Sequence, residues 1–228
     1  MEELIQFDKQ LLLMVNGSDS LFIDSLATTL TNAKTWIPLY VALFYVVLRN
    51  STTAAKMLIT LAAAGLCVFL AGALDDSIVK PLVARWRPTR DPEIGILVDT
   101  VDGYRGGKYG FFSAHAANTF SIALFFSLMF RRRAFVVMMV AYSLINCWTR
   151  LYLGVHYPGD ITVGLLWGAV VGYSVYRLYS YALRKYESRY AEPSPNTQHS
   201  SPVTHLDISI LVFVATLVFA LGKALWVS

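Results

Sequence analysis

Charged residues are scarce in this chain. Asp, Glu, Lys and Arg make up 15% of its 228 residues, whereas 56% are hydrophobic. The mean hydropathy of +0.51 lies far above that of soluble globular domains. This shortage of charge excludes a soluble cytosolic enzyme. The formal net charge is +4, but the basic residues form short groups between long apolar runs, so nucleic-acid binding is not expected.

Cysteine is also scarce, and the N-terminus lacks the positive charge of a signal peptide. Cys67 and Cys147 lie within apolar runs without metal-ligand spacing, so we expect both to be buried as small apolar residues. Glu2, Glu3 and Asp8 precede a short apolar patch, which is the wrong charge order for a signal peptide. The pattern favours an amphipathic helix over residues 1–16 that lies on the membrane surface.

Long apolar runs predict an all-α integral membrane bundle of about six helices, since each span needs roughly 20 residues. We expect one membrane domain over residues 1–228. The limits of the first span are the least defined, because its first half contains Asn32 and Lys34. Residues 188–204 are rich in Pro and Ser and predict a mobile connector, with His199 and His205 as solvated histidines in it or at its edge. The predicted spans are 22–48, 57–79, 113–130, 134–148, 160–181 and 206–227.

The basic residues give a nearly balanced indication of sidedness. With alternating spans, one side receives Arg49, Lys56, Arg131, Arg132, Arg133, Arg184, Lys185 and Arg189. The other side receives Lys80, Arg85, Arg87, Arg90, Arg105, Lys108 and Arg150. Three consecutive arginines fill the shortest loop of the first group, which favours the cytoplasm for that side. We therefore expect a protein of the bacterial inner membrane with its second group of loops in the periplasm.

The first polar cluster runs from Lys80 to Arg87 and Pro88. A separation of seven residues places two cations on one face of a helix, with Pro88 ending that helix. Asp76, four residues before Lys80, is placed to pair with it. Cations that merely reach from a helix end to the membrane surface explain this cluster equally well.

Two further clusters fall on the same predicted membrane face. Ser113 is a natural N-cap, and His115 lies in the first turn of the helix that it would cap, where backbone N–H groups favour an anion. Arg150 and His156 bracket a short loop, and Asp160 follows His156 by one helical turn. A carboxylate at that distance can fix the imidazole tautomer and leave the other ring nitrogen as a nucleophile. The simpler alternatives are a structural His115 and an Asp160 that only caps its helix.

Together the clusters suit a phosphate ester. Lys80, Arg87 and Arg150 can hold the phosphate oxygens, while one histidine attacks phosphorus and the other protonates the departing oxygen. The paired acidic residues that would bind Mg²⁺ are missing from the clusters, so neither a metal nor another cofactor is expected.

This arrangement resembles the type 2 phosphatidic acid phosphatases, and specifically their bacterial membrane branch. Their pattern is a lysine followed after six residues by Arg-Pro, then Pro-Ser-Gly-His, then Ser-Arg, His and Asp at the spacing seen here. The resemblance covers residues 80–160 and departs from the pattern at Phe112, Ala114 and Thr149. It implies a helical membrane bundle, a phosphohistidine at His156 and a general acid at His115. It also implies that the phosphate binds to Lys80, Arg87, Ser113 and Arg150.

The resemblance predicts a lipid phosphatase whose partners are a membrane lipid phosphate and the bilayer, with no protein partner inferred. Undecaprenyl pyrophosphate is favoured, because Arg90, Arg105 and Lys108 could bind a second phosphate, while lipid A phosphate and phosphatidylglycerol phosphate remain open. Residues 90–110, with mixed charge and five glycines, predict either a flap over the site or an inert connector. The alternative hypotheses are a non-catalytic anion-binding transporter and a vanadate-dependent haloperoxidase. The soluble fold of the haloperoxidases conflicts with the high hydropathy of this chain.

Overall fold

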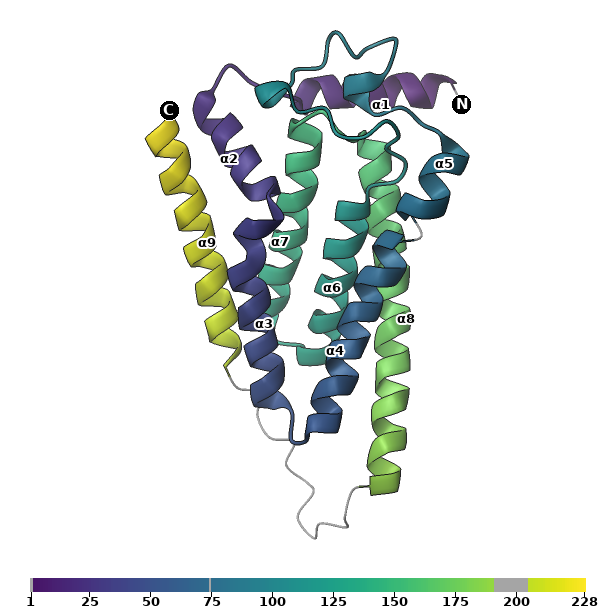
Figure 1. The fold of residues 1–228 in the computed structure, drawn as a ribbon, viewed down its shortest axis with the longest axis vertical. Coiled ribbons are helices and arrows are strands. Elements are labelled where there is room, and N and C mark those ends of the chain that lie inside the picture. Colours follow the sequence, from purple (N-terminus) through teal and green to yellow (C-terminus); the bar gives the residue numbers. More distant parts are fainter. Residues whose placement is uncertain (1, 74, 191–204) are drawn as a thin grey trace.

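The computed structural model describes residues 2–73, 75–190 and 205–228, apart from the side chain of Asp76. Helices dominate these residues, and the only strand-like pairing in the described ranges is a bridge between Trp86 and Tyr109. The long helices run side by side, and α1 lies across one end of the bundle (Figure 1). In chain order the helices are α1 (Glu2–Val15), α2 (Leu21–Thr31), α3 (Ile37–Asn50), α4 (Ala54–Val68), α5 (Lys80–Val83), α6 (Ala114–Phe130), α7 (Arg133–Tyr152), α8 (Pro158–Tyr190) and α9 (Leu206–Val227).

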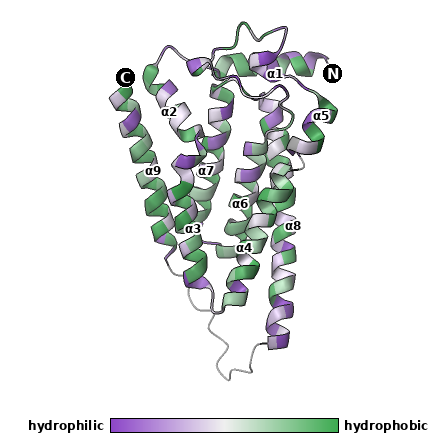
Figure 2. Ribbon diagram, viewed as in Figure 1, coloured by the Kyte–Doolittle hydropathy of each residue, from purple (hydrophilic) through white to green (hydrophobic). Residues whose placement is uncertain are grey.

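The all-α membrane bundle is confirmed. Four stretches are long and apolar enough to cross a bilayer, namely Ala54–Val83, α7, α8 and α9. Hydrophobic residues make up most of α3 and α9 (Figure 2), and the exposed hydrophobic residues of the long helices include Phe44, Leu166 and Leu211. The helix α6 is 17 residues long, and α2 and α3 are shorter still. The total of six spans therefore stays a prediction.

The first predicted span is not one helix but two. At Asn32 the backbone is extended, and its side-chain oxygen accepts a hydrogen bond from the N–H of Lys34 (3.0 Å). A 3-10 turn over Ala33–Trp36 follows before α3 begins. Trp36 is buried and donates its indole N–H to the carbonyl of Leu30 (2.8 Å), which joins the two halves. An asparagine side chain that accepts from the backbone N–H two residues later competes with the helix and explains the break.

The helix α4 also changes its winding before the site. It begins at Ala54, three residues before the predicted start, and passes into π-helical turns over Phe69–Ala73 and Asp75–Val79. The wider turns displace the backbone from a straight helix before α5 begins at Lys80.

Three glycines of α8 set the packing against α6. A Cβ atom added at Gly164, Gly168 or Gly172 would lie 2.6 Å from a backbone oxygen of α6 or of its cap. Only glycine allows the two backbones to approach so closely. As a result the two helix starts lie together, and the N–H of Ser113 donates to the carbonyl of Asp160 (3.1 Å). This close packing aligns two of the three motifs.

Other local predictions have mixed outcomes. Cys67 and Cys147 are buried free thiols, as expected.

The helix α8 continues to Tyr190, so the prediction that the connector starts at residue 188 was wrong, because residues 188–190 are helical. Residues 191–204, including His199, lie outside the described part. His205 is half-buried with its ring 5.8 Å from that of Tyr45, which corrects the expectation of a solvated histidine.

Candidate active site

The three motifs meet at the end of the bundle where α1 lies. They comprise α5 and the segment after it, the start of α6, and the loop between α7 and α8 (Figure 1). The arginine group at residues 131–133 lies at the opposite end. Lys80, Arg87, Arg150 and His156 all lie within electrostatic range of His115. The structure thus brings together the cations and histidines that the sequence singled out.

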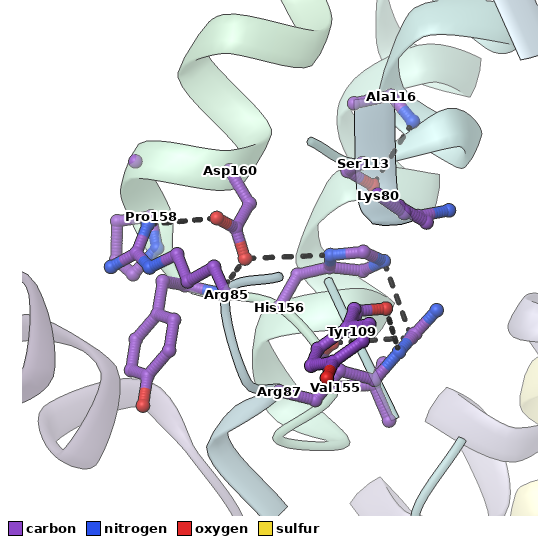
Figure 3. A network of polar contacts seen from close by, with 12 residues as sticks. Lys80, Arg85, Arg87, Tyr109, Ser113, Ala116, Val155, His156, Pro158 and Asp160 are labelled. Atoms are coloured by element: carbon purple, nitrogen blue, oxygen red, sulfur yellow. Dashed lines mark hydrogen bonds and ion pairs between the residues drawn. The ribbon is translucent and has the colours of Figure 1, made fainter. Parts of the chain in front are cut away.

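The ring of His156 lies between the carboxylate of Asp160 and the guanidinium of Arg87. Its side chain is buried, and its Nδ1 atom lies 3.6 Å from Oδ2 of Asp160 (Figure 3). The same carboxylate oxygen accepts the backbone N–H of Tyr157 (3.0 Å). On the other side of the ring, Nε2 lies 3.4 Å from Nη1 of Arg87. Nδ1 therefore faces the carboxylate, and Nε2 faces the cations.

Burial keeps this imidazole neutral. It lowers the pKa of His156 to about 4, with Arg87 and Arg150 acting in the same direction and Asp160 opposing them. A neutral ring retains the lone pair that a nucleophile requires.

Arg85 is a member of the site that the sequence reasoning missed. Its Nη1 lies 2.8 Å from Oδ1 of Asp160, and its Nη2 lies 2.6 Å from Oδ2 of Asp8 in α1. The other oxygen of Asp8 accepts the N–H of Gly159 at the start of α8 (2.7 Å). A continuous chain of contacts therefore runs from α1 through Arg85 and Asp160 to His156. The available signal was an acidic residue on the polar face of an amphipathic helix, but its partner could not be read from spacing.

Lys80 and Arg87 converge by a different route from the predicted one. The expectation of two helical turns was wrong, because α5 ends at Val83 and Ala84 adopts a left-handed conformation with φ of 49°. Arg87 lies on extended backbone, and Pro88 opens a 3-10 turn rather than ending a helix. Lys80 pairs with Asp75 (2.8 Å). The side chain of Asp76, its predicted partner, lies outside the described part.

The extended segment is fixed beside the site by its pairing with residues 109 and 110. Arg87 donates from Nε to the carbonyl of Tyr109 (3.1 Å) and from Nη1 to that of Val155 (3.2 Å). Gly110 allows this close approach, since a Cβ atom on it would lie 3.1 Å from Cγ of Arg87 and 3.3 Å from Oδ2 of Asp160. Two motifs thereby reach contact distance.

Ser113, His115 and Arg150 form the second half of the site. Ser113 is the N-cap of α6, as predicted, with its Oγ accepting the N–H of Ala116 (3.4 Å). Nη1 of Arg150 lies 3.2 Å from Nε2 of His115, and Nη2 donates to the hydroxyl of Tyr104 (3.2 Å). Within the described ranges Arg150 is buried without a carboxylate partner, and its Nε makes no hydrogen bond. A buried guanidinium in this state is prepared to receive an anion.

The departures from the family pattern leave this geometry intact. Ala114 is the first residue of α6, so its backbone N–H stays at the helix start. Thr149 is buried and donates its hydroxyl to the carbonyl of Asn146 (2.8 Å). Phe112 is buried in the apolar core.

Residues 90–110 are neither a free flap nor an inert connector. Ile94 and Val98 are buried against Leu12 of α1. Lys9 pairs with Asp91 (3.4 Å) and with Glu93. The first half of this segment therefore fastens α1 over the site, and the second half brings Tyr104 to Arg150.

Comparison with known proteins identifies the family. Residues 37–184 match the model of the PAP2 superfamily, so the chain belongs to that superfamily. A lipid A 4'-phosphatase of Bacteroides thetaiotaomicron is 35% identical over 95% of this chain and 94% of its own length. A lipid A 4'-phosphatase of Porphyromonas gingivalis is 32% identical over 94% of this chain and 91% of its own length. A decaprenylphosphoryl-5-phosphoribose phosphatase of Mycobacterium tuberculosis is 38% identical over 48% of this chain and 55% of its own length.

No solved structure is significantly similar to the chain. Family membership and the full-length relatives define this protein as a phosphatase of membrane lipids, which confirms the predicted enzyme class. The alternatives of a non-catalytic transporter and a haloperoxidase are not supported.

Proposed function

We propose that this enzyme hydrolyses a phosphate monoester of lipid A or of a closely related acylated sugar, through a phosphohistidine at His156. The observation that carries the proposal is the orientation of His156, whose Nδ1 faces Asp160 while Nε2 faces Arg87. Anion binding alone does not need a buried, neutral and oriented imidazole. The two full-length relatives supply the headgroup class.

In the first step Nε2 of His156 attacks phosphorus, a P–N bond forms, and the P–O bond to the lipid breaks. His115 donates a proton to the departing oxygen. Asp160 stabilises the imidazolium that forms at His156, in the way a triad aspartate does. In the second step His115 takes a proton from water, which attacks phosphorus and releases inorganic phosphate. The P–N bond breaks and His156 returns to its neutral form.

The phosphate oxygens are bound by Lys80, Arg87, Arg150 and the start of α6. The hydroxyl of Ser113 caps the helix through its oxygen, so its proton remains available for a phosphate oxygen. These donors are fixed in place before the reaction, which is what lowers the energy of a transition state with developing charge.

Undecaprenyl pyrophosphate becomes the second candidate. This substrate was favoured because Arg90, Arg105 and Lys108 could bind a second phosphate, but two of these cations already interact with other groups of the protein. Arg90 donates to the carbonyl of Gly106 (3.3 Å), and the ammonium of Lys108 lies 4.8 Å from the ring centre of Trp86.

The direct test is phosphate release by the purified full chain in mixed micelles. The substrates are lipid A, undecaprenyl pyrophosphate and phosphatidylglycerol phosphate, each compared with a short-chain analogue. We expect release from lipid A, weak release from short-chain analogues, and no loss of rate after prolonged chelation. Absence of release from every lipid phosphate would overturn the proposal, and recovery of a chelated enzyme by Mg²⁺ or Zn²⁺ would contradict metal independence.

We also propose that the site faces the periplasm of the inner membrane, because the three consecutive arginines at residues 131–133 favour the cytoplasm for the opposite end. Ile96 is 95% exposed at the site end, and both native cysteines are buried. Ile96→Cys should therefore react with an impermeant thiol reagent added to intact cells, while Arg132→Cys should react only after the membrane is opened. The reverse pattern would invert the orientation.

A further inference from the structure

A cavity of about 420 Å³ opens beside His115 inside the bundle. His115, Asn118, Thr119 and Ile122 line it along one face of α6. The separation of seven residues between His115 and Ile122 corresponds to roughly 10 Å along a helix. The cavity therefore starts at His115, the proposed general acid, and extends along α6 into the bundle.

The cavity exists because two helices depart from regular geometry around it. Thr31, Ala33 and Trp36 come from the break between α2 and α3. On another side, Val68 is the last residue of α4 before the π-helical turn at Phe69–Ala73. Such turns are frequent at functional sites.

The lining carries more hydrogen-bonding groups than a lipid chain needs. Oδ1 of Asn118 is buried and has no hydrogen-bond partner among the described residues. Asn146 is 4% exposed and donates from Nδ2 to the carbonyl of Tyr142 (2.9 Å). A polar side chain at membrane depth without a full set of partners is costly, and it therefore suggests a ligand.

Gly72, in the π-helical turn of residues 69–73, provides the space for Asn118. A Cβ atom at Gly72 would lie 2.7 Å from Nδ2 of Asn118. The amide is therefore accommodated by the irregular turn that helps to form the cavity.

We propose that this cavity binds the leaving alcohol of the substrate and that Asn118 and Asn146 hydrogen-bond to polar groups next to its phosphate. This inference rests on the proposed function, since it assumes that His115 protonates the leaving oxygen. The chemistry fits an acylated amino sugar, whose amide, ester and hydroxyl groups lie within a few bonds of the phosphate. A polyprenyl chain offers none of these groups and would leave Oδ1 of Asn118 without a hydrogen-bond partner. Unpaired polar groups give strong discrimination between such substrates.

The test compares kcat/KM for an acylated glucosamine phosphate with kcat/KM for a polyprenyl phosphate, both in mixed micelles. Asn118→Leu removes the amide at similar volume, so we expect the ratio of the two values to fall about 10-fold. Gly72→Ala keeps the amide but displaces it, and should shift the ratio in the same direction. Ser127→Ala, which removes a buried hydroxyl further along α6, should leave the ratio unchanged.

Inhibition by vanadate, measured in each variant, verifies that the phosphate site is intact. An unchanged ratio in both cavity variants, with normal vanadate inhibition, would overturn the inference while leaving the phosphatase assignment in place. A wild-type enzyme that cleaves neither substrate would instead overturn the proposed function.

Discussion

The two histidines of the site have opposite surroundings. His156 is 1% exposed and is linked through Asp160 and Arg85 to Asp8 of α1. His115 is exposed to the intramembrane cavity, and Arg150 is the only hydrogen-bonding partner described for its ring. A nucleophile must present one nitrogen in one direction, whereas an acid must follow the leaving oxygen and then activate water. In the proposed mechanism, therefore, the half of the site that is anchored to α1 forms the covalent bond, and the half that opens to the cavity receives the lipid and transfers the protons.

The largest loss of activity is expected at His156. His156→Ala removes the attacking nitrogen, so it should abolish essentially all lipid phosphate release. The measurement is phosphate release by variant protein with the elution profile of the wild type in detergent. Turnover near the wild-type rate would remove His156 from its role.

Loss of the ion pairs between Arg85, Asp160 and Asp8 should reduce turnover nearly as much. Arg85→Met leaves Asp160 and Asp8 without their shared cation, so Asp160 is no longer held against the imidazole. We expect kcat to fall about 100-fold with little change in KM, since small displacements of a reacting group cost that much. Arg85→Lys should restore part of the rate.

Arg132→Met is the matched control, because it removes an exposed ion pair with Asp207 at the opposite end of the bundle. Its kcat should equal that of the wild type. An Arg85→Met enzyme that raises KM and preserves kcat would show that Arg85 binds substrate instead of positioning Asp160.

A smaller loss of activity, which depends on the substrate, is expected at His115. His115→Ala should slow the hydrolysis of alkyl phosphates by roughly 100-fold or more, because a poor leaving group needs a proton in the transition state. Aryl phosphates carry a good leaving group and should lose much less. Equal losses on both substrates would argue against an acid role.

The smallest effect concerns pH. Since burial lowers the pKa of His156 to about 4, protonation removes its lone pair only as the pH falls through that value. The ring should stay neutral from about pH 8 to about pH 5, whereas an ordinary histidine titrates near 6.5. Asp160→Asn should lower the pKa further, because the carboxylate favours the protonated ring.

Nitrogen-labelled histidine followed by NMR gives this titration, with His156→Gln identifying the signal. A midpoint near that of a free histidine would show that His156 is not sequestered as described.

The sequence predicted the membrane bundle and the meeting of the motifs, because apolar length and polar clusters at helix ends are local features. It did not predict the path from Lys80 to Arg87, since a spacing of seven residues suits both two helical turns and a short helix followed by extended chain. The left-handed Ala84 ends the helix, and backbone hydrogen bonds from Arg87 to Lys108 and from Gly110 to Arg85 hold the chain that follows in an extended form.

The ion pair between Asp8 and Arg85 could not be predicted for the same reason, because it depends on the tertiary fold. Asp8 and Arg85 are 77 residues apart, and nothing in their spacing indicates that α1 folds back over the site. The cavity was also out of reach, because it results from two helix irregularities that meet only in the folded bundle. Asn32 was a sign of one of them, but from the sequence alone it indicated only a poorly defined first span.

The most direct test of a covalent phosphate on His156 is to trap it. His115→Ala should form the intermediate from a labelled aryl phosphate and hydrolyse it slowly, because no base activates the water. Rapid quenching in base should then show labelled phosphate on the protein that is released by acid, as expected for a phosphorus–nitrogen bond. We expect this label in His115→Ala and its absence when His156→Ala is added. An active enzyme that never carries the label, or a label that persists without His156, would contradict it.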